Sequence, residues 1–169
     1  MMYVFLYLFA IVAANLVTAR FGPVASVVNA FLFIGFDLVS RDKLHDSWAG
    51  RHLWAKMFLL IAAGSALSYL LNRDAGQIAL ASLVAFAAAG LVDAVSYHLL
   101  RHRSRLLRMN GSNIPAALVD SVVFPTLAFG SVMPLIVLGQ FLAKVIGGAF
   151  WSLVIHYRAS RLSVSGHGA

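Results

Sequence analysis

The chain has 169 residues, of which 61% are hydrophobic and only 11% carry a charge. A soluble globular domain usually carries about 25% charged residues, so this composition excludes a water-soluble fold and indicates an integral membrane protein. The sequence contains no cysteine, which excludes disulfides, thiol chemistry and cysteine-ligated metals.

Six apolar stretches follow one another along the chain, and short connections separate them. A membrane-spanning helix needs about 20 mostly apolar residues. The first stretch lacks the basic start and the small-residue cleavage site of a signal peptide, so we expect it to remain as the first helix. The sequence therefore predicts an all-α integral membrane protein with a single domain over residues 1–158. We expect a six-transmembrane-helix bundle with helices at about 2–19, 24–40, 53–71, 77–100, 113–130 and 133–157.

Turn-forming residues indicate where these helices begin and end. Gly22-Pro23 separates the first two. The sequence Asn110-Gly111-Ser112-Asn113 before Pro115 is typical of a turn, an N-cap and a proline in the first helical turn. Pro125 predicts a kink within the fifth helix. Residues 159–169 are small and polar, and we expect a disordered cytoplasmic tail there.

The basic residues are divided unevenly between the two sides of the predicted bundle. Six helices place both termini on one side, and nine basic residues fall on that side against two on the other. Positive residues concentrate in cytoplasmic loops, so we expect both termini to be cytoplasmic. The nine are Arg41, Lys43, Arg51, Arg101, Arg103, Arg105, Arg108, Arg158 and Arg161, and the two are Arg20 and Arg73.

Four ionisable residues lie inside the apolar stretches: Asp37, Asp93, Asp120 and Lys144. A charged side chain at the bilayer centre costs roughly 3 kcal/mol or more, so an intramembrane charge indicates a functional site by default. With the helix ends given above, Asp93 and Asp120 lie about seven residues, or about 10 Å, from the cytoplasmic interface. Lys144 lies near the midplane. We expect the four groups to form one band in the cytoplasmic half to the midplane.

Small residues share helix faces with these charges, since residues four apart point the same way. Gly139, Ala143 and Gly147 form one such face, and Gln140 and Lys144 lie on the adjacent line. Small residues let helices approach closely, so the charges belong to packing faces. The pattern predicts a cavity lined by these charges, the amides Asn15 and Gln140, and the aromatic rings Phe33 and Phe124.

Each charged residue also has a purely structural interpretation. Asp37 has Arg41 one helical turn away as an ion-pair partner. Asp93 and Asp120 could each be satisfied by Lys144 or by a hydrogen bond between helices. Lys144 could extend to the interface, although its reach from the midplane is poor.

Motifs of metal and hydrolytic chemistry give little support for an enzyme. His98 and His102 have a metal-ligand spacing, but the arginine-rich surroundings disfavour a cation. The chain has no Gly-x-Ser-x-Gly elbow and no glutamate for a His-Glu-x-x-His motif. We therefore expect neither an enzyme nor a bound metal or cofactor.

The stretch FLFIGFDLVSR, residues 31–41, resembles the second-helix signature of the vitamin uptake transporter family, whose members include bacterial queuosine precursor transporters. The resemblance extends over residues 3–157. It includes Asn15 in the first helix, Gly90-Leu91-Val92-Asp93 in the fourth, Ser112 to Phe129 around Asp120 in the fifth, and Lys144 in the sixth.

The resemblance implies import of 7-cyano-7-deazaguanine or 7-aminomethyl-7-deazaguanine across a bacterial inner membrane, without direct nucleic-acid binding. The expected substrate-binding residues are Asp37, Asp93, Asp120, Lys144, Asn15, Gln140, Phe33 and Phe124. Asp120 or Asp37 would accept hydrogen bonds from the N–H donors of the base edge. Lys144 would balance the charge of the carboxylates or donate to the carbonyl oxygen of the base. Asp93 would couple transport to the movement of protons.

A second interpretation is the substrate-binding subunit of an energy-coupling factor transporter. Such subunits use an Ala-x-x-x-Ala face in their first helix to dock the coupling subunit, and Ala10 and Ala14 have this spacing. An intramembrane enzyme is a third. The sequence leaves the coupling ion, the preferred deazapurine and homo-oligomerisation open.

Overall fold

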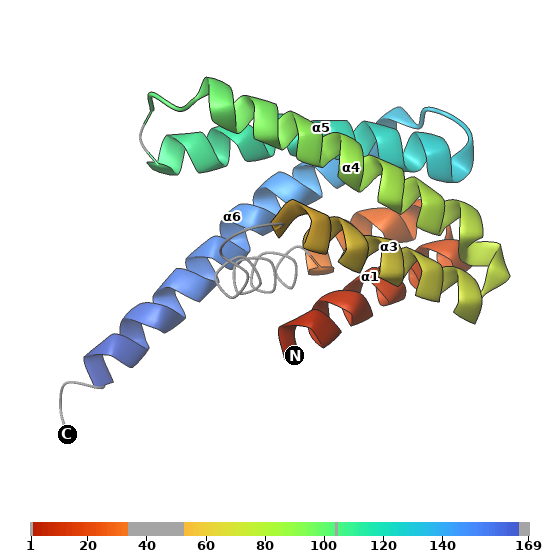
Figure 1. Ribbon diagram of the computed structural model, residues 1–169, viewed down its shortest axis with the longest axis horizontal. Coiled ribbons are helices and arrows are strands. Elements are labelled where there is room, and N and C mark those ends of the chain that lie inside the picture. Colours follow the sequence, from red (N-terminus) through yellow and green to blue (C-terminus); the bar gives the residue numbers. More distant parts are fainter. Residues whose placement is uncertain (1, 34–52, 104, 166–169) are drawn as a thin grey trace.

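The computed structural model of the chain describes residues 2–33, 53–103 and 105–165 (Figure 1). Within these ranges all regular elements are helices. They are α1 (Met2–Phe21), the segment Pro23–Phe33, α3 (Leu53–Leu71), the short 3-10 turn η1 (Arg73–Ala75), α4 (Gly76–Leu99), α5 (Arg105–Phe129) and α6 (Pro134–Ser165).

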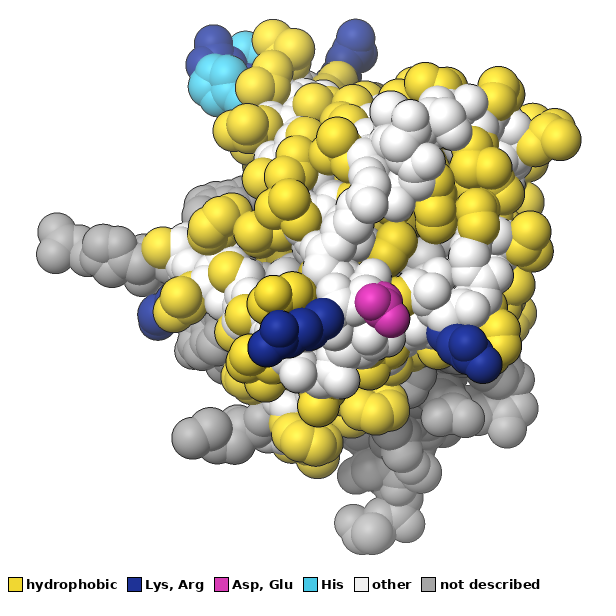
Figure 2. All heavy atoms as spheres, turned by 90° about the vertical axis from the view of Figure 1, so that its right-hand side faces the viewer, with side chains coloured by type: hydrophobic (Ala, Val, Ile, Leu, Met, Phe, Trp, Pro, Cys, Tyr) yellow, Lys and Arg dark blue, Asp and Glu magenta, His cyan; other side chains and the backbone are white. Residues whose placement is uncertain are grey.

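The described helices alternate in direction between two ends of the molecule. One end, here the Arg73 end, carries the turn at Gly22, η1 and the connection from α5 to α6. The other, the Arg101 end, carries the connection from α4 to α5 (Figure 1). α4 and α5 run side by side along most of their length, and α6 diverges from them toward its C-terminal end. Figure 2 looks onto the Arg73 end, where charged side chains gather within a largely apolar surface.

The helices have the length and composition of a multi-pass membrane protein. Three contain apolar stretches long enough to cross a bilayer, over Val4–Phe21, Arg73–Leu99 and Gly111–Phe129. Three shorter apolar helices accompany them, at Pro23–Phe33, Ala55–Leu71 and Pro134–Gly148. The all-α membrane architecture expected from composition is therefore confirmed. The predicted second helix is described as far as Phe33, so Asp37 and Arg41 lie outside the described residues.

Two boundaries predicted from sequence are wrong. The expected turn at Asn110–Asn113 is helical, because α5 begins at Arg105 and contains both Pro115 and Pro125. Gly111 serves close packing here, since a Cβ atom added to it would lie 2.8 Å from Leu100 Cδ1. The second error concerns the tail, where α6 continues to Ser165 through residues expected to be disordered. Extending an existing helix needs no new nucleus, which favours this continuation.

α1 and α3 cross closely because small and polar residues of α3 face α1. A Cβ atom added to Gly64 would lie 2.8 Å from Ile11 Cγ2. One turn further along, Asn15 Nδ2 donates to Ser68 Oγ at 3.1 Å. The buried side chains Tyr7, Met57, Leu60 and Ile61 extend this contact toward the Arg101 end. Gly64 therefore sets the distance between the two helices.

We expect Gly64→Ala to lower the thermal stability of the detergent-purified protein. The added methyl group overlaps the Ile11 side chain, and overpacking typically costs about 1–3 kcal/mol. Gly148→Ala is the matched control, because nothing lies within 4 Å of its Cβ position. Its melting temperature should stay the same or rise, since alanine is the better helix former. Equal melting temperatures for the two variants would show that the α1–α3 distance is adjustable.

Candidate functional site

A cavity of about 150 Å³ lies where four numbered helices and the segment Pro23–Phe33 converge. α1 and this segment supply mostly amides and hydroxyls, α4 supplies one serine, and α5 and α6 supply the charged residues. The lining comprises Ala14, Asn15, Thr18, Ser26, Asn29, Ala30, Ser82, Asp120, Phe124, Gln140 and Lys144. An apolar cavity of this size accommodates a single benzene ring, whereas eight of the eleven residues that line this cavity are polar or charged.

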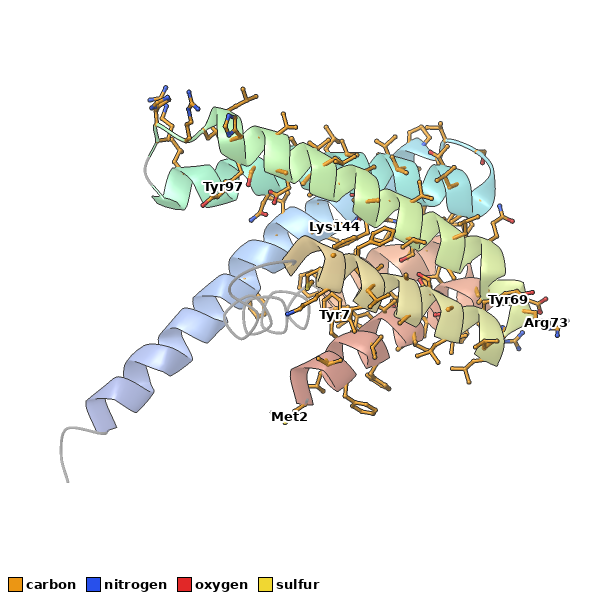
Figure 3. The ribbon with its side chains drawn as sticks, in the orientation of Figure 1. Met2, Tyr7, Tyr69, Arg73, Tyr97 and Lys144 are labelled. Atoms are coloured by element: carbon orange, nitrogen blue, oxygen red, sulfur yellow. The ribbon has the colours of Figure 1, made fainter. Side chains whose placement is uncertain are left out.

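The ion pair between Lys144 and Asp120 joins α6 to α5 at the cavity. Lys144 Nζ donates to Asp120 Oδ2, to Ser121 Oγ at 3.2 Å and to Gln140 Oε1 at 3.3 Å. A lysine ammonium has three N–H donors, so all three have an acceptor. The side chains of Lys144 and Asp120 are 15% and 28% exposed. Figure 3 shows Lys144 near the middle of the bundle, between Tyr97 and Arg73.

Gln140 connects this ion pair to the start of the segment Pro23–Phe33. Its Oε1 accepts from Lys144, and its Nε2 donates to Ser26 Oγ at 2.7 Å. Ser26 Oγ in turn donates to the backbone carbonyl of Pro23 at 2.5 Å. Gln140 and Ser26 are both almost fully buried. A continuous chain of hydrogen bonds therefore runs from Asp120 to the turn between α1 and the next helix.

A second group of hydrogen bonds holds the amides of the cavity wall. Asn29 Nδ2 donates to Thr18 Oγ1 and to the carbonyl of Ala14, both at 3.0 Å. Asn15 Nδ2 donates to Ser68 Oγ, which donates to the carbonyl of Gly64 at 2.8 Å. Buried amides need such partners, because an unpaired one costs free energy. These bonds fix both asparagine side chains against α1 and α3.

Three side chains of the lining each have an oxygen atom that can accept a hydrogen bond from a ligand. Asn15 and Asn29 use only their NH₂ groups in the hydrogen bonds described above, and Asp120 uses only Oδ2. One oxygen of each therefore accepts no hydrogen bond from the residues that the structure describes. Oxygen acceptors in such a cavity favour a ligand with several N–H donors.

Among the described residues, Phe124 supplies the one aromatic ring of the lining. It packs edge-on against Phe129, with ring centroids 6.4 Å apart. Phe33 is not among the lining residues. Elsewhere on α6, Phe150 stacks on Phe31 of the segment Pro23–Phe33, with centroids also 6.4 Å apart.

The structure brings together five of the eight residues expected at the site: Asn15, Asp120, Phe124, Gln140 and Lys144. Phe33 and Asp93 do not line the cavity, and Asp37 lies outside the described residues. Asp120 has Lys144 as its partner, whereas Asp93 does not pair with that lysine. Asp93 Oδ1 is buried and accepts no hydrogen bond from the residues that the structure describes.

The ion pair lies near the middle of the apolar part of α5. This part covers Gly111–Phe129, and Asp120 lies about nine residues, or about 14 Å, from either end of it. The rest of the lining extends from the ion pair toward the Arg73 end. The expected distance of Asp120 from the cytoplasmic interface stays a prediction.

Sequence reasoning missed the hydroxyl groups of the site. Thr18, Ser26 and Ser121 accept hydrogen bonds from Asn29, Gln140 and Lys144, respectively. Of these three donors, Gln140 and Lys144 were expected at the site and Asn29 was not. Serine and threonine in an apolar helix often bond their own backbone, so composition alone gives no signal for them. The spacing of Asn15 and Thr18, three residues apart on one helix face, is the one pattern that could have indicated a polar wall.

Comparison with known proteins identifies a family. The comparison with curated proteins gives no match, and neither does the comparison with solved structures. The sequence model of a family described as "Putative vitamin uptake transporter" matches residues 2–158, almost the whole chain. This is a family of transporters and not of enzymes, and it agrees with the multi-pass helical architecture and the polar cavity. The chain belongs to the vitamin uptake transporter family.

Proposed function

We propose that this chain imports a queuosine precursor, 7-cyano-7-deazaguanine or 7-aminomethyl-7-deazaguanine, across a bacterial inner membrane. The observation that carries the proposal is the polar cavity at mid-depth, which contains a carboxylate, an ammonium, two amide oxygens and an aromatic ring. Binding sites near the bilayer midplane are typical of secondary transporters.

The hydrogen-bonding groups of a deazaguanine match the lining. Its Watson–Crick edge presents adjacent N–H donors, which the carboxylate of Asp120 can accept together with the oxygens of Asn15 or Asn29. Its carbonyl oxygen can accept from Lys144 or Gln140. The flat ring can stack on Phe124, because every base has a π-face. Each group of the ligand edge therefore has a counterpart in the cavity.

A neutral ligand would replace existing hydrogen bonds of Lys144 with new ones, and it would bring no charge into the cavity. Lys144 already satisfies its three N–H groups with Asp120, Ser121 and Gln140. A ligand carbonyl would replace one of the neutral acceptors, while the ion pair stays intact. The cavity then remains electrically balanced with and without a neutral ligand, which keeps the cost of desolvation low.

We also propose that six helices cross the membrane and that both termini are cytoplasmic. In the described part of the chain, the Arg101 end carries four arginines: Arg101, Arg103, Arg105 and Arg108. The Arg73 end carries two, Arg20 and Arg73. The positive-inside rule then favours a cytoplasmic Arg101 end.

The alternative role as a substrate-binding subunit of an energy-coupling factor transporter finds less support. Docking to a coupling subunit would need an exposed Ala10–Ala14 face on α1. Ala10 is buried, and Ala14 lines the cavity and accepts a hydrogen bond from Asn29 through its carbonyl. The face is therefore covered by the chain's own helices.

We expect Asp120→Asn and Lys144→Met each to abolish uptake of labelled 7-cyano-7-deazaguanine. Either change leaves the other charge unpaired and removes a proposed ligand contact, and losing one partner of a buried pair costs about 3–5 kcal/mol. Uptake is measured in cells that lack queuosine synthesis, their own transporter and any coupling ATPase of the energy-coupling factor type.

Matched controls for these two variants are Asp74→Asn and Arg73→Met, both exposed in the structure. The controls should transport normally, and all four proteins should be present in the membrane at similar levels. Normal uptake by Asp120→Asn would contradict the proposed site. Loss of uptake by the unmodified chain in this host would favour the alternative role.

Asp93 is the proposed proton-coupling group, and its position outside the cavity separates coupling from binding. We expect Asp93→Asn to abolish accumulation against a gradient, because the amide cannot gain or lose the proton. Exchange of labelled for unlabelled substrate across vesicles should continue in the same variant. Loss of both activities would instead place Asp93 in binding or folding.

Analogues of the ligand test whether the cavity recognises the N–H donors on the Watson–Crick edge of the deazaguanine. We expect the analogue without the exocyclic amino group to compete for uptake about tenfold less well or worse. It leaves a buried acceptor unpaired, which costs about 1–3 kcal/mol, and 1.4 kcal/mol corresponds to a factor of ten. Inhibition constants from competition with the labelled substrate provide the measurement. Equal competition would show that the cavity does not recognise this edge.

A further inference from the structure

The lining of the cavity is unevenly exposed. Thr18, Ser26, Asn29 and Gln140 are between 2% and 7% exposed, whereas the side chains of Lys144 and Asp120 are 15% and 28% exposed. The charged part of the cavity is therefore less covered by the chain than its neutral part. This difference indicates from which direction the cavity is accessible.

The two parts of the lining occupy different depths. Thr18 and Ser26 each lie about three residues, or about 5 Å, from Phe21 and Pro23 at the Arg73 end. Asp120 and Lys144 lie about nine or ten residues, or about 14 Å, from the same end. The buried neutral groups thus stand between the ion pair and the Arg73 end.

Apolar packing closes the bundle beyond the neutral groups. Ile78, Ala81 and Ala128 form a buried cluster between α4 and α5. The partly buried side chains of Ala19, Phe124 and Phe129 pack against it. Because residues 19, 78 and 129 lie near helix ends, this cluster is a seal at the Arg73 end.

We infer that the structure shows the state in which the site is closed toward the Arg73 end and open toward the Arg101 end. Two hydrogen bonds form the closed gate: Gln140 to Ser26, and Asn29 to Thr18. Each joins two helices across the lining, so Ser26 and Thr18 are positioning residues of the gate. This inference rests on the proposed transport function, but it does not depend on which substrate is carried.

The chain around the gate has the geometry that an opening movement needs. The segment Pro23–Phe33 follows Gly22, which has a φ of 77°, and α6 closely follows Gly130, which has a φ of 72°. Glycine adopts such angles without strain. At Gly139, α6 approaches Val27 so closely that an added Cβ atom would lie 3.2 Å from its methyl groups. Rotation at the two glycines would separate these helices and break the Gln140–Ser26 bond.

Toward the Arg101 end, Phe31 of the segment Pro23–Phe33 stacks on Phe150 of α6. These two residues are 38% and 50% exposed. Among the described residues, this pair is therefore not a buried apolar cluster like the one around Ile78.

Cysteine accessibility tests the inference directly, because the chain contains no cysteine of its own. Ala30→Cys places a reporter in the lining, and Asp74→Cys and His102→Cys place exposed controls at the two ends. A charged, membrane-impermeant methanethiosulfonate is applied to right-side-out and to inside-out vesicles. We expect Ala30→Cys to react from the side that labels His102→Cys and at least tenfold more slowly from the side that labels Asp74→Cys.

Removing a gate bond should change this pattern. We expect Ser26→Ala to raise labelling of Ala30→Cys from the Asp74 side about tenfold, while the exposed Ser131→Ala leaves it unchanged. Unaltered labelling of the two end reporters in the Ser26→Ala background shows that the protein is folded and correctly oriented. Fast labelling of Ala30→Cys from the Asp74 side without the gate mutation overturns the inference. Labelling from neither side, or no change with Ser26→Ala, overturns it as well.

The labelling experiment and the uptake experiment fail independently. Labelling needs no substrate, so the gate can be correct when 7-cyano-7-deazaguanine is not transported. Conversely, uptake of this compound with labelling from the wrong side would retain the proposed function and reject the gate.

Discussion

The ammonium group of Lys144 is the constraint on which the rest of the site depends. An ammonium at mid-depth in a membrane must find acceptors for three N–H donors, since the surrounding hydrocarbon offers none. Asp120 and Ser121 on α5 and Gln140 one turn earlier on α6 provide them. This requirement fixes the contact between α5 and α6, and it orients the Gln140 amide so that its NH₂ group reaches Ser26. The position of one lysine therefore organises three elements.

Small residues decide where these polar groups can meet. Side-chain hydrogen bonds between helices require close backbones, and glycine allows this at Gly64 between α1 and α3 and at Gly139 between α6 and Val27. Gly64 lies one turn from Ser68, which accepts a hydrogen bond from Asn15, and Gly139 is the neighbour of Gln140, which donates to Ser26. Close packing and polar contacts are thus coupled, which is typical of helix association in membranes.

The sequence could predict those site residues whose charged or amide side chains cost free energy when they face hydrocarbon. Asp120, Lys144, Asn15 and Gln140 stand out in apolar helices, and the structure places all four at one cavity. Local patterns failed where packing decided the outcome. Asn110–Asn113 has the residues of a turn, but Gly111 packs against Leu100 and the helix continues. The hydroxyls of Thr18 and Ser26 gave no signal, because only the arrangement of neighbouring helices shows what they bond.

The magnitudes of the interactions indicate which bonds can change during transport. A neutral hydrogen bond between membrane helices contributes about 0.6 kcal/mol on average, whereas separating a buried ion pair leaves charges whose exposure to hydrocarbon costs several kcal/mol. The hydrogen bonds toward the Arg73 end, from Gln140 to Ser26 and from Asn29 to Thr18, are neutral. A flat ligand that gains two or three hydrogen bonds could offset their loss, but could not replace the Lys144–Asp120 pair. We therefore expect the neutral wall to move while the ion pair stays closed, so that the charge at mid-depth is shielded throughout the cycle.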